Sequence, residues 1–432
     1  MSADKYDVII IGGGPAGLAA AYKLAEAGME VVLIERGDYP GSKNLSGGVL
    51  YSRILDQLIP GFWEDAPVER YITNYITTMM TKDDYFNLEY KGKALGNPPY
   101  NAFAVLRAKF DRWLAEKAEE AGAMIVTGIK VEKVVKAGNR IIGISTGEEE
   151  MLADVVIAAD GINSFISREA GLRGDLRPEH LAVGAKALIE LPREVIEERF
   201  RLNSNEGTAF AILGEATYGV AGGAFFYTNL DSLSLGVVMR LDDLARAGIK
   251  PVDALDDLLD HPLVAPLVKG GKMVEYGAHL TGEGGLHMVP SKLYADGMLI
   301  VGDAAGFTIN SGLVIRGMDL AIGSGMMAAD AVLEAKEKND FSANSLSVYQ
   351  QKLEDSFIMK DLKLYAKMPE FMESERLFKQ YSSMANLLLA KVYTHDLTPK
   401  KHLLKSAMDT IKEERISMIG LIKDGIKGVR AL

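Results

Sequence analysis

The stretch from Tyr6 to Arg36 limits the possible folds of this chain more than any other part of the sequence. An apolar run from Val8 to Ile11 leads into the sequence GGGPAG at residues 12–17, and a helical pattern follows. A second apolar run from Val31 to Ile34 then ends in Glu35. A strand, a glycine loop, a helix and a second strand in this order predict a βαβ unit.

The glycines of this loop suit a phosphate-binding turn. Gly12 permits the tight turn, Gly14 lets the backbone approach a pyrophosphate, and Gly17 permits close packing of helix on strand. The free N–H groups at the start of the helix can then hold the phosphates. Glu35 lies 21 residues after Gly14, where it can accept from a ribose 2′-OH, and its charge argues against NADP. We predict dinucleotide binding; the alternative is a glycine-rich turn that binds nothing.

Two later apolar runs also end in acidic residues. One ends in Asp160-Gly161 and the other in Gly302-Asp303. Ligands of α/β sheets bind at the carboxyl ends of the strands, so Asp303 can accept from a ribityl hydroxyl. A helix beginning near Gly312-Leu313 would direct its positive dipole end at N1 and O2 of a flavin. Three such strand ends in this order favour a flavin nucleotide, for which binding roles of the carboxylates suffice.

The length and texture of the chain predict several folding units. At 432 residues it is too long for one compact core. Short alternating runs at 176–275 predict an antiparallel sheet that forms a substrate domain. Residues 1–175 and 276–338 would form the two parts of the nucleotide-binding domain, and 339–432 a helical C-terminal region. The fold class is therefore α/β.

Composition excludes several kinds of chemistry. The chain has no cysteine, which excludes disulfides, thiolate nucleophiles and any cysteine-held iron–sulfur cluster on this chain. Its six histidines show no HxxxH pairing, so we expect no metal site. The net charge of −11 disfavours nucleic acid as a partner. No stretch is long and apolar enough to span a bilayer and no cleavable leader is visible, so we expect a cytoplasmic protein.

Four stretches leave two interpretations open. The loop at 41–48 is either a plain connection or a surface for a flat ring. The apolar cluster at 54–63 is either core or an exposed edge for a lipid-like substrate, and the aromatic residues at 218–227 are either core or contacts of a planar ligand. Residues 391–432 carry nine lysines and arginines against five acidic residues. They form either ordinary packed helices or a contact with an anionic membrane or a partner subunit.

With these motifs in place, the chain resembles flavoproteins of the glutathione-reductase type, which have a two-dinucleotide-fold FAD domain. More narrowly it resembles the electron-transfer-flavoprotein:quinone oxidoreductases and their Fix-type, FixC-like relatives. The matching stretches are GSKNLSGGVLY at 41–51, YGAHLTGEGGLHMVP at 276–290 and GDAAGFTINSGLVIRGMDLAIGSG at 302–325. The resemblance spans residues 5 to about 335 and extends more weakly into the helical tail.

The resemblance implies a function and a set of partners. Mitochondrial members carry a ferredoxin-like domain with cluster-binding cysteines, and this chain has neither, so it resembles the FAD subunit of the split, Fix-type version. The implied partners are the alpha and beta subunits of an electron-transfer flavoprotein, a small ferredoxin-like iron–sulfur subunit and an isoprenoid quinone. Such an assembly oxidises NADH and sends electrons to quinone and to low-potential ferredoxin, which is electron bifurcation. The chain would lie peripherally on the inner face of the cell membrane.

The resemblance also implies site residues for a non-covalently bound FAD. The pyrophosphate, ribose and adenine half would be held by Gly12, Gly14, Pro15, Ala16, Gly17, Glu35, Arg36, Arg107 and Val131. The ribityl chain and ring would be held by Ser46, Gly47, Gly48, Asp160, Gly161, Gly302, Asp303, Gly312 and Leu313. Loose similarity suggests four quinone contacts, Tyr218, Gly222, Phe226 and Gly285. No residue is predicted to be catalytic, because the flavin carries the chemistry.

Three other functions remain alternatives. A geranylgeranyl-reductase-like flavoprotein shares the fold and hydrogenates lipid double bonds, but such enzymes usually carry a cysteine where this chain has Asn-Leu-Ser at 44–46. A flavin monooxygenase would consume oxygen with NADPH. A structural scaffold, whose FAD merely positions partners, is the third.

Overall fold

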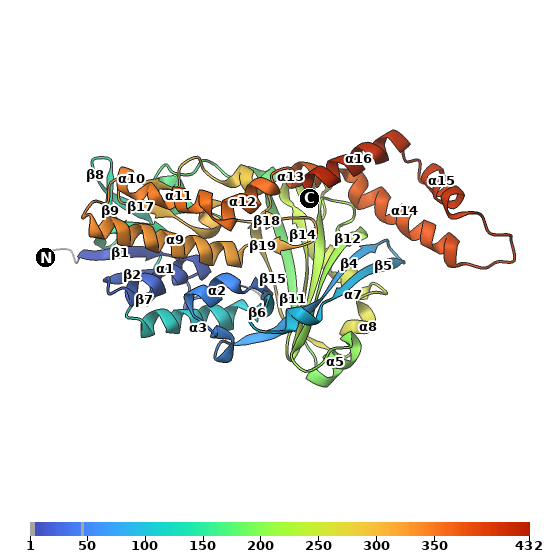
Figure 1. The fold of residues 1–432 in the computed structure, drawn as a ribbon, viewed down its shortest axis with the longest axis horizontal. Coiled ribbons are helices and arrows are strands. Elements are labelled where there is room, and N and C mark those ends of the chain that lie inside the picture. The colour runs from blue at the N-terminus through green and yellow to red at the C-terminus, as the bar shows by residue number, and fades with distance from the viewer. Residues whose placement is uncertain (1–4, 45–46) are drawn as a thin grey trace.

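The computed structural model describes residues 5–44 and 47–432, in an elongated body from which a helical arm projects (Figure 1). Two large sheets lie in the body, and a short hairpin of β18 (Ile309–Asn310) and β19 (Ile315–Arg316) lies apart from them. The combination of α/β sheets with a helical C-terminal region confirms the predicted fold class.

The first sheet is the dinucleotide-binding sheet. Its strands run in the order β16 (Tyr294–Ala295), β17 (Met298–Ile300), β10 (Glu150–Ala158), β1 (Lys5–Ile11), β2 (Val31–Glu35) and β7 (Met124–Thr127). The strands from β17 to β7 are parallel, and β8 (Lys133–Ala137) and β9 (Arg140–Ser145) extend the sheet beside β10. The predicted βαβ unit is therefore present.

Apolar residues fill the central strands of this sheet because both of its faces are covered. Val8, Ile9 and Ile10 of β1 are completely buried. Helix α1 (Pro15–Glu26) packs between α3 (Arg107–Glu120) and α9 (Met318–Glu337). The backbones of α1 and α9 approach so closely that a Cβ on Gly325 would lie 2.1 Å from the carbonyl oxygen of Ala16, so only glycine fits there.

The second sheet has nine strands and is formed by two separate parts of the chain. Its order is β15 (Lys272–Gly282), β11 (Leu181–Glu190), β14 (Ser232–Arg240), β13 (Gly222–Thr228), β12 (Glu206–Gly214), β4 (Val68–Met80), β6 (Ala102–Leu106) and β3 (Gly47–Tyr51), with β5 (Tyr85–Lys91) beside β4. The predicted strands within 176–275 are mutually antiparallel, but β12 pairs in parallel with β4. Strands β3 to β6 lie within residues 1–175, which the sequence pattern assigns to the nucleotide-binding domain.

The remaining helices cover the sheets or form the C-terminal region. Those before α9 are α2 (Arg53–Leu58), α4 (Phe165–Glu169), α5 (Arg193–Phe200), α6 (Leu241–Ala247), α7 (Pro251–Asp260) and α8 (Ala265–Val268). Helices α6 to α8 were not expected from the sequence. The apolar cluster at 54–63 is core: Leu55 and Phe62 are buried, and the Phe62 ring packs edge-on against Phe103.

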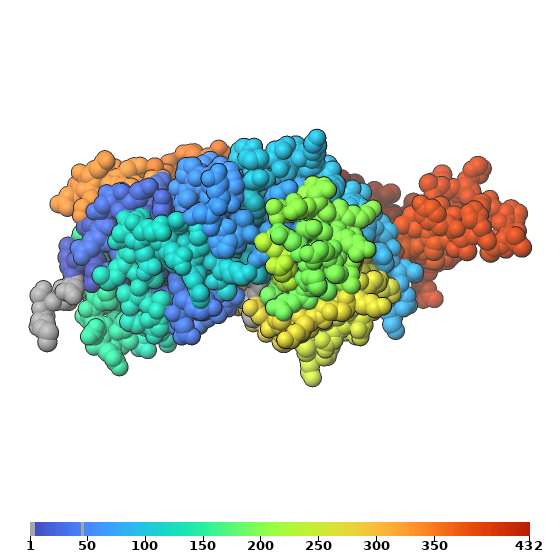
Figure 2. Space-filling view, turned by 90° about the horizontal axis from the view of Figure 1, so that it is seen from below, coloured from blue at the N-terminus to red at the C-terminus, as the bar shows by residue number. Residues whose placement is uncertain are grey.

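The helical C-terminal region predicted from the sequence has two parts. Helices α10 (Ala343–Leu346), α11 (Val348–Asp355), α12 (Phe357–Leu364) and α13 (Met368–Phe371) lie along the body. Helices α14 (Glu375–Tyr393), α15 (Leu403–Glu413) and α16 (Met418–Ala431) form an arm that extends beyond it, seen in red at one end of the molecule in Figure 2. Helix α16 returns to the body and contacts α13. Within residues 5–44 and 47–432, no helix is long and apolar enough to cross a membrane.

Candidate functional site

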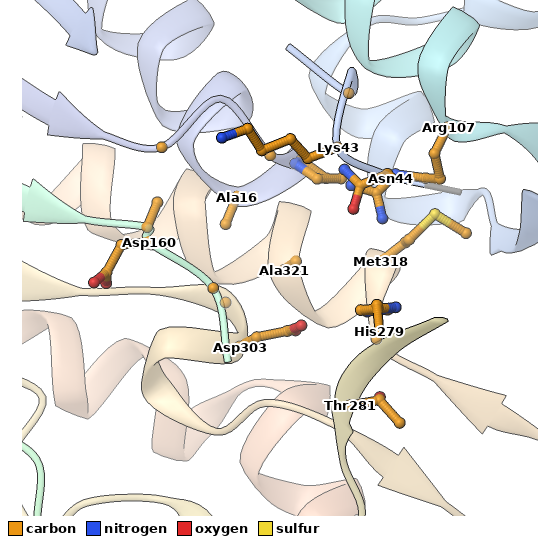
Figure 3. A pocket seen from close by; sticks show the side chains of 18 of the residues that line it. Ala16, Lys43, Asn44, Arg107, Asp160, His279, Thr281, Asp303, Met318 and Ala321 are labelled. Carbon is orange, nitrogen blue, oxygen red and sulfur yellow. The ribbon is translucent and has the colours of Figure 1, made fainter. Parts of the chain in front are cut away.

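A cavity of about 610 Å³ lies between the two sheets, at the carboxyl ends of β1, β2, β10 and β17. Its walls combine the glycine loop, the ends of these strands, the start of α9 and one face of the second sheet (Figure 3). The volume is in the range of small-molecule and cofactor sites. The cavity thus joins the regions that the sequence predicts to bind a nucleotide.

The glycine loop forms an open cradle at one end of the cavity. Gly12 has φ of +106°, and a Cβ there would lie 2.4 Å from the carbonyl oxygen of Ala159. A Cβ on Gly14, in contrast, would have no atom of the described chain within 4 Å, because this residue faces the open cavity. Helix α1 begins at Pro15 without a side-chain cap or an acidic residue in its first turn. Its first N–H groups are therefore suited to an anion such as a pyrophosphate.

Glu35 is held rigidly at the end of β2. Its Oε2 accepts from the backbone N–H of Gly13 at 2.8 Å, and its Oε1 accepts from that of Gly37 at 2.6 Å. The carboxylate lines the cavity beside Arg36. Each oxygen keeps a lone pair, so Glu35 can still accept a ribose hydroxyl.

Asp160 has a carboxylate oxygen that lacks a partner. Its Oδ2 accepts from the N–H of Ile166 at 2.9 Å, whereas its Oδ1 is buried and has no hydrogen-bond partner in the described part of the chain. Burial raises the pKa of Asp160, although Arg173 and Arg36 oppose this effect. The Thr308 hydroxyl, also at the cavity wall, is likewise buried without a partner among the described residues. Such polar atoms fit a ligand that supplies hydroxyl or phosphate groups.

The loop after β17 is fixed from several sides. The N–H of Gly302 donates to Ser324 Oγ of α9 at 2.9 Å, and Arg173 Nη1 donates to the carbonyl oxygen of Asp303 at 2.8 Å. Burial raises the pKa of the Asp303 carboxyl, and the charges of Arg107 and Arg173 offset only part of this rise. The carboxylate extends into the cavity from the loop (Figure 3). Asp303 is thus positioned to accept from a hydroxyl of a bound ligand.

The start of α9 differs from the prediction. The sequence suggested a helix beginning near Gly312-Leu313, but α9 begins at Met318. Gly312 has φ of +80° and lies in the turn between β18 and β19, and 53% of Leu313 is exposed. Gly317 and Met318 line the cavity in their place, so the helix dipole acts from there.

Arg107 lies at the first position of α3, opposite the start of α9. Its guanidinium donates to both carboxylate oxygens of Asp111 at 2.7 Å, and Asn44 Nδ2 donates to the same carboxylate at 3.3 Å. Figure 3 shows Arg107 and Asn44 close together at the cavity wall. This ion pair fixes the cationic side chain where it can contact a ligand.

The cavity brings together most of the predicted cofactor residues. Those that line it are Gly12, Gly14, Pro15, Ala16, Glu35, Arg36, Gly47, Gly48, Arg107, Val131, Asp160, Gly161, Gly302 and Asp303. Gly17 packs behind the cradle, where a Cβ would lie 2.1 Å from the carbonyl oxygen of Gly12. Gly312 and Leu313 are not among the lining residues, and Ser46 lies outside the described residues.

The four predicted quinone contacts lie elsewhere. The Tyr218 hydroxyl donates to Asp257 Oδ2 at 2.7 Å, and Phe226 is 1% exposed in the core of the second sheet. A Cβ on Gly222 would lie 2.0 Å from the carbonyl oxygen of Val238, and one on Gly285 would lie 3.7 Å from Pro369. None of the four lines the described cavity.

Of the residues with which the second sheet faces the cavity, sequence reasoning weighed only Phe225 and Tyr227, as either core or contacts of a planar ligand. Lys186 of β11, Phe225 and Tyr227 of β13, and His279 and Thr281 of β15 lie on this face, and Glu283 follows β15. These residues alternate along their strands, which is a signal that the sequence contains. Polar residues in alternation are, however, equally typical of a solvent-exposed sheet face.

The comparisons with known proteins agree with this site. The model of the FAD binding domain family matches residues 5–188, and that of the ETF-QO/FixC family C-terminal domain matches residues 368–432. With the nucleotide cradle, these matches define an FAD-dependent oxidoreductase. The chain is 44% identical to the probable electron transfer flavoprotein-quinone oxidoreductase YdiS of Escherichia coli, and 37% identical to protein FixC of Bradyrhizobium diazoefficiens, over 100% of each chain. The chain therefore belongs to the ETF-QO/FixC family, which confirms the resemblance seen in its sequence.

Solved structures share the fold at lower identity. A geranylgeranyl bacteriochlorophyll reductase-like protein of Thermoplasma acidophilum superposes with a TM-score of 0.72 at 23% identity, covering 98% of this chain and 99% of that one. The myxobacterial FAD-dependent halogenase CndH superposes with a TM-score of 0.66 at 17% identity, covering 96% of this chain and 97% of that one. At such identities the likeness shows a common fold.

Proposed function

We propose that this chain binds one FAD non-covalently and passes electrons from an electron-transfer flavoprotein, an iron–sulfur subunit or both to a membrane quinone. The observation that carries the proposal is the continuity of the cavity from the nucleotide cradle to the face of the second sheet. An acceptor can therefore reach the ring end of a bound dinucleotide without leaving the cavity. When bound, FAD supplies the redox chemistry, because its ring accepts and releases one or two electrons.

The proposed nucleotide position follows the cavity wall. The pyrophosphate lies against the residue 12–16 loop, and the adenosine ribose lies at Glu35 and Arg36. The ribityl chain lies near Asp160 and Asp303, where Asp160 Oδ1, which has no partner among the described residues, supports a hydroxyl-bearing ligand. The ring lies between residues 47–48 and the start of α9. Each protein group here binds or orients the cofactor.

The partners in the proposal follow from the relatives and from the composition. The relatives match this chain over their full length, and they are named protein FixC or probable electron transfer flavoprotein-quinone oxidoreductase. This chain has no cysteine, so a small ferredoxin-like subunit would hold the iron–sulfur cluster of the complex. The proposed complex also contains the alpha and beta subunits of an electron-transfer flavoprotein, oxidises NADH and bifurcates its electrons.

The C-terminal arm is the proposed membrane contact. On α16, the side chains of Ile419, Ile422, Ile426 and Val429 are all exposed, the last to 80%. Lys423, Lys427 and Arg430 lie among them on the same helix. A helix with apolar and basic residues of this kind suits an anionic membrane surface. Retention of the protein on anionic vesicles, and loss of this retention after Ile422→Asp and Ile426→Asp substitution, tests this part.

The main experiment measures electron transfer in the holoprotein. The purified chain is loaded with FAD, reduced anaerobically, and mixed with a soluble quinone such as menadione, with oxygen and with a geranylgeranyl lipid in parallel samples. We expect quinone to reoxidise the flavin faster than either alternative. Reoxidation by the lipid alone would contradict the proposal in favour of lipid hydrogenation, and reoxidation by oxygen alone in favour of a monooxygenase. If the chain holds FAD but neither quinone, oxygen nor lipid reoxidises it, the result would indicate a scaffold.

The second experiment identifies the partners. A tagged chain is recovered from native cells, and the proteins that accompany it are identified by mass spectrometry. The proposal predicts two flavoprotein subunits and a small cysteine-rich protein in stoichiometric amounts. Recovery of the intact holoprotein without any of these would contradict the proposed complex.

A further inference from the structure

At Gly184 of β11, the face that the second sheet turns to the cavity carries no side chain, and we call this position the hollow. In the strand register, Gly184 lies opposite Val238 of β14 on one side and His279 of β15 on the other. The atoms nearest to a Cβ on Gly184 would be Lys186 Cε at 3.5 Å, the carbonyl oxygen of His279 at 3.8 Å and Val238 Cγ2 at 3.8 Å. These are ordinary contact distances, so a Cβ fits at this position, and Gly184 itself lines the cavity.

Two nitrogen-bearing side chains border this hollow. Lys186 follows Gly184 on the same face of β11, because alternate residues of a strand point to the same side. His279 extends into the cavity from β15, as Figure 3 shows. The Lys186 Nζ lies 5.7 Å from the centroid of the Phe225 ring and makes no hydrogen bond or ion pair within the described residues. The proposed binding of FAD leaves both side chains without a role.

The protonation states of these groups suit a ligand that accepts hydrogen bonds. Burial and the charge of Arg107 lower the pKa of Lys186 to about 8, so its ammonium remains protonated at neutral pH. Burial, together with Lys186 and Arg107, lowers the pKa of His279 to about 4, so this imidazole is neutral and keeps one N–H donor. The other charged groups that line this side of the cavity are Arg107, Glu283, Asp303 and Arg316.

Resting on the proposed function, we propose that Lys186 and His279 bind one carbonyl oxygen of a planar quinone whose ring lies over Gly184. Phe225 and Val238 provide apolar contacts for the ring, and the Lys186 ammonium and the His279 N–H donate to the oxygen. The quinone takes two electrons from the reduced flavin, which releases its own protons to water, and each of the two quinone oxygens takes up one proton. Lys186 gives the proton to the oxygen that it binds and then regains one from water, and the second oxygen is protonated by water.

The first test compares Lys186→Met with Lys186→Arg in FAD-loaded protein. Menadione is titrated against the oxidised holoprotein while the flavin spectrum is recorded, and the reduced holoprotein is then reoxidised by menadione without oxygen. We expect Lys186→Met to retain FAD but to raise the menadione dissociation constant about tenfold or more, because it removes a charged donor. Lys186→Arg restores most of the binding. The exposed Lys272→Met on β15 is the matched control.

The pH dependence gives a second readout of the same variants. We expect the reoxidation rate of the wild-type protein to fall as pH rises through about 8, where Lys186 loses its proton. The rate of Lys186→Met lacks this fall. A lysine with only a structural role would not change the shape of the profile.

The hollow itself is tested by Gly184→Leu, whose side chain would occupy the space proposed for the ring. We expect loss of menadione binding with FAD retained. Gly174→Leu, at an exposed glycine with open space around its Cβ position, is the control. If Lys186→Met does not fold, menadione binding by Gly184→Leu and Lys186→Arg still tests the proposed quinone site.

The outcomes separate this inference from the proposed function. Suppose that menadione reoxidises the wild-type protein, and that Lys186→Met and Gly184→Leu bind menadione and react with it as the wild-type protein does. The inference is then wrong and the proposed function stands. If no quinone reoxidises the wild-type holoprotein, the proposed function fails together with the inference.

Discussion

The backbone N–H of Gly13 donates to Glu35 Oε2 at 2.8 Å, and this hydrogen bond joins the loop after β1 to the end of β2. The other oxygen of the carboxylate accepts from Gly37 at 2.6 Å. Besides the role proposed for it at a ribose, Glu35 therefore has a structural role. It fixes the loop after β1 and the loop after β2 in one relative position.

Replacement of Glu35 by Gln tests this double role. One of the two backbone donors would then face the amide NH₂ group, which leaves a buried N–H without an acceptor and costs about 1–3 kcal/mol. We expect lower stability of the apoprotein in urea and an FAD dissociation constant that is about tenfold higher. The exposed Glu30→Gln just before β2 is the control. An unchanged FAD affinity would show that Glu35 does not contact the nucleotide.

The open space in front of Gly14 leads to a second prediction. Because a Cβ there would meet no described atom within 4 Å, Gly14→Val fits the apoprotein without a clash. Its side chain would instead occupy the position proposed for the pyrophosphate. We expect near wild-type circular dichroism and unfolding, but no retained flavin absorbance. Gly174→Val, which also has open space around its Cβ, should retain FAD.

A third prediction contrasts two helical glycines. A Cβ on Gly325 of α9 would lie 2.1 Å from the Ala16 carbonyl oxygen, whereas one on the exposed Gly425 of α16 would meet nothing within 4 Å in the described chain. We expect Gly325→Ala to destabilise the protein by about 1–3 kcal/mol through overpacking of α1 against α9. Gly425→Ala should stabilise α16 by up to about 1 kcal/mol, since alanine is the better helix former. Equal effects in chemical denaturation would contradict the packing argument.

The nucleotide-binding half of the cavity could be predicted because its requirements are local in sequence. The turn at Gly12, the open position of Gly14 and the close contact of Gly17 occur within one βαβ unit. Asp160 and Asp303 could be added because the carboxyl ends of parallel strands meet at one edge of a sheet. Each of these features depends on the backbone conformation of one short segment, and local sequence patterns indicate that conformation well.

The face that the second sheet turns to the cavity could not be predicted in the same way. Lys186 and His279 alternate with apolar neighbours, as they would on a solvent-exposed sheet. They face the cavity because this sheet packs against a domain far away in sequence, and local patterns do not contain that packing. The start of α9 was misjudged for a related reason. Gly312 lies in a left-handed turn between two-residue strands, and such short strands leave almost no periodic signal.

A fourth prediction concerns Glu283, which accepts from Asn310 Nδ2 at 2.9 Å at the cavity wall. Burial raises the pKa of its carboxyl from 4.5 to about 6. Between these pH values the folded protein binds more protons than the unfolded chain, so the free energy of unfolding falls as pH rises. Above pH 6 the charged carboxylate destabilises the apoprotein by about 2 kcal/mol relative to its protonated form.

Urea unfolding of the apoprotein between pH 4 and pH 8 measures this effect. We expect Glu283→Gln to match the wild-type protein near pH 4, because the wild-type carboxyl is then protonated and equally uncharged. By pH 8 the variant should be more stable by about 2 kcal/mol, because glutamine has no charge to bury. Glu275→Gln, at an exposed position of β15, the strand that Glu283 follows, should show no such divergence. Parallel pH profiles for wild-type and Glu283→Gln proteins would mean that the cavity solvates this carboxylate as well as water does.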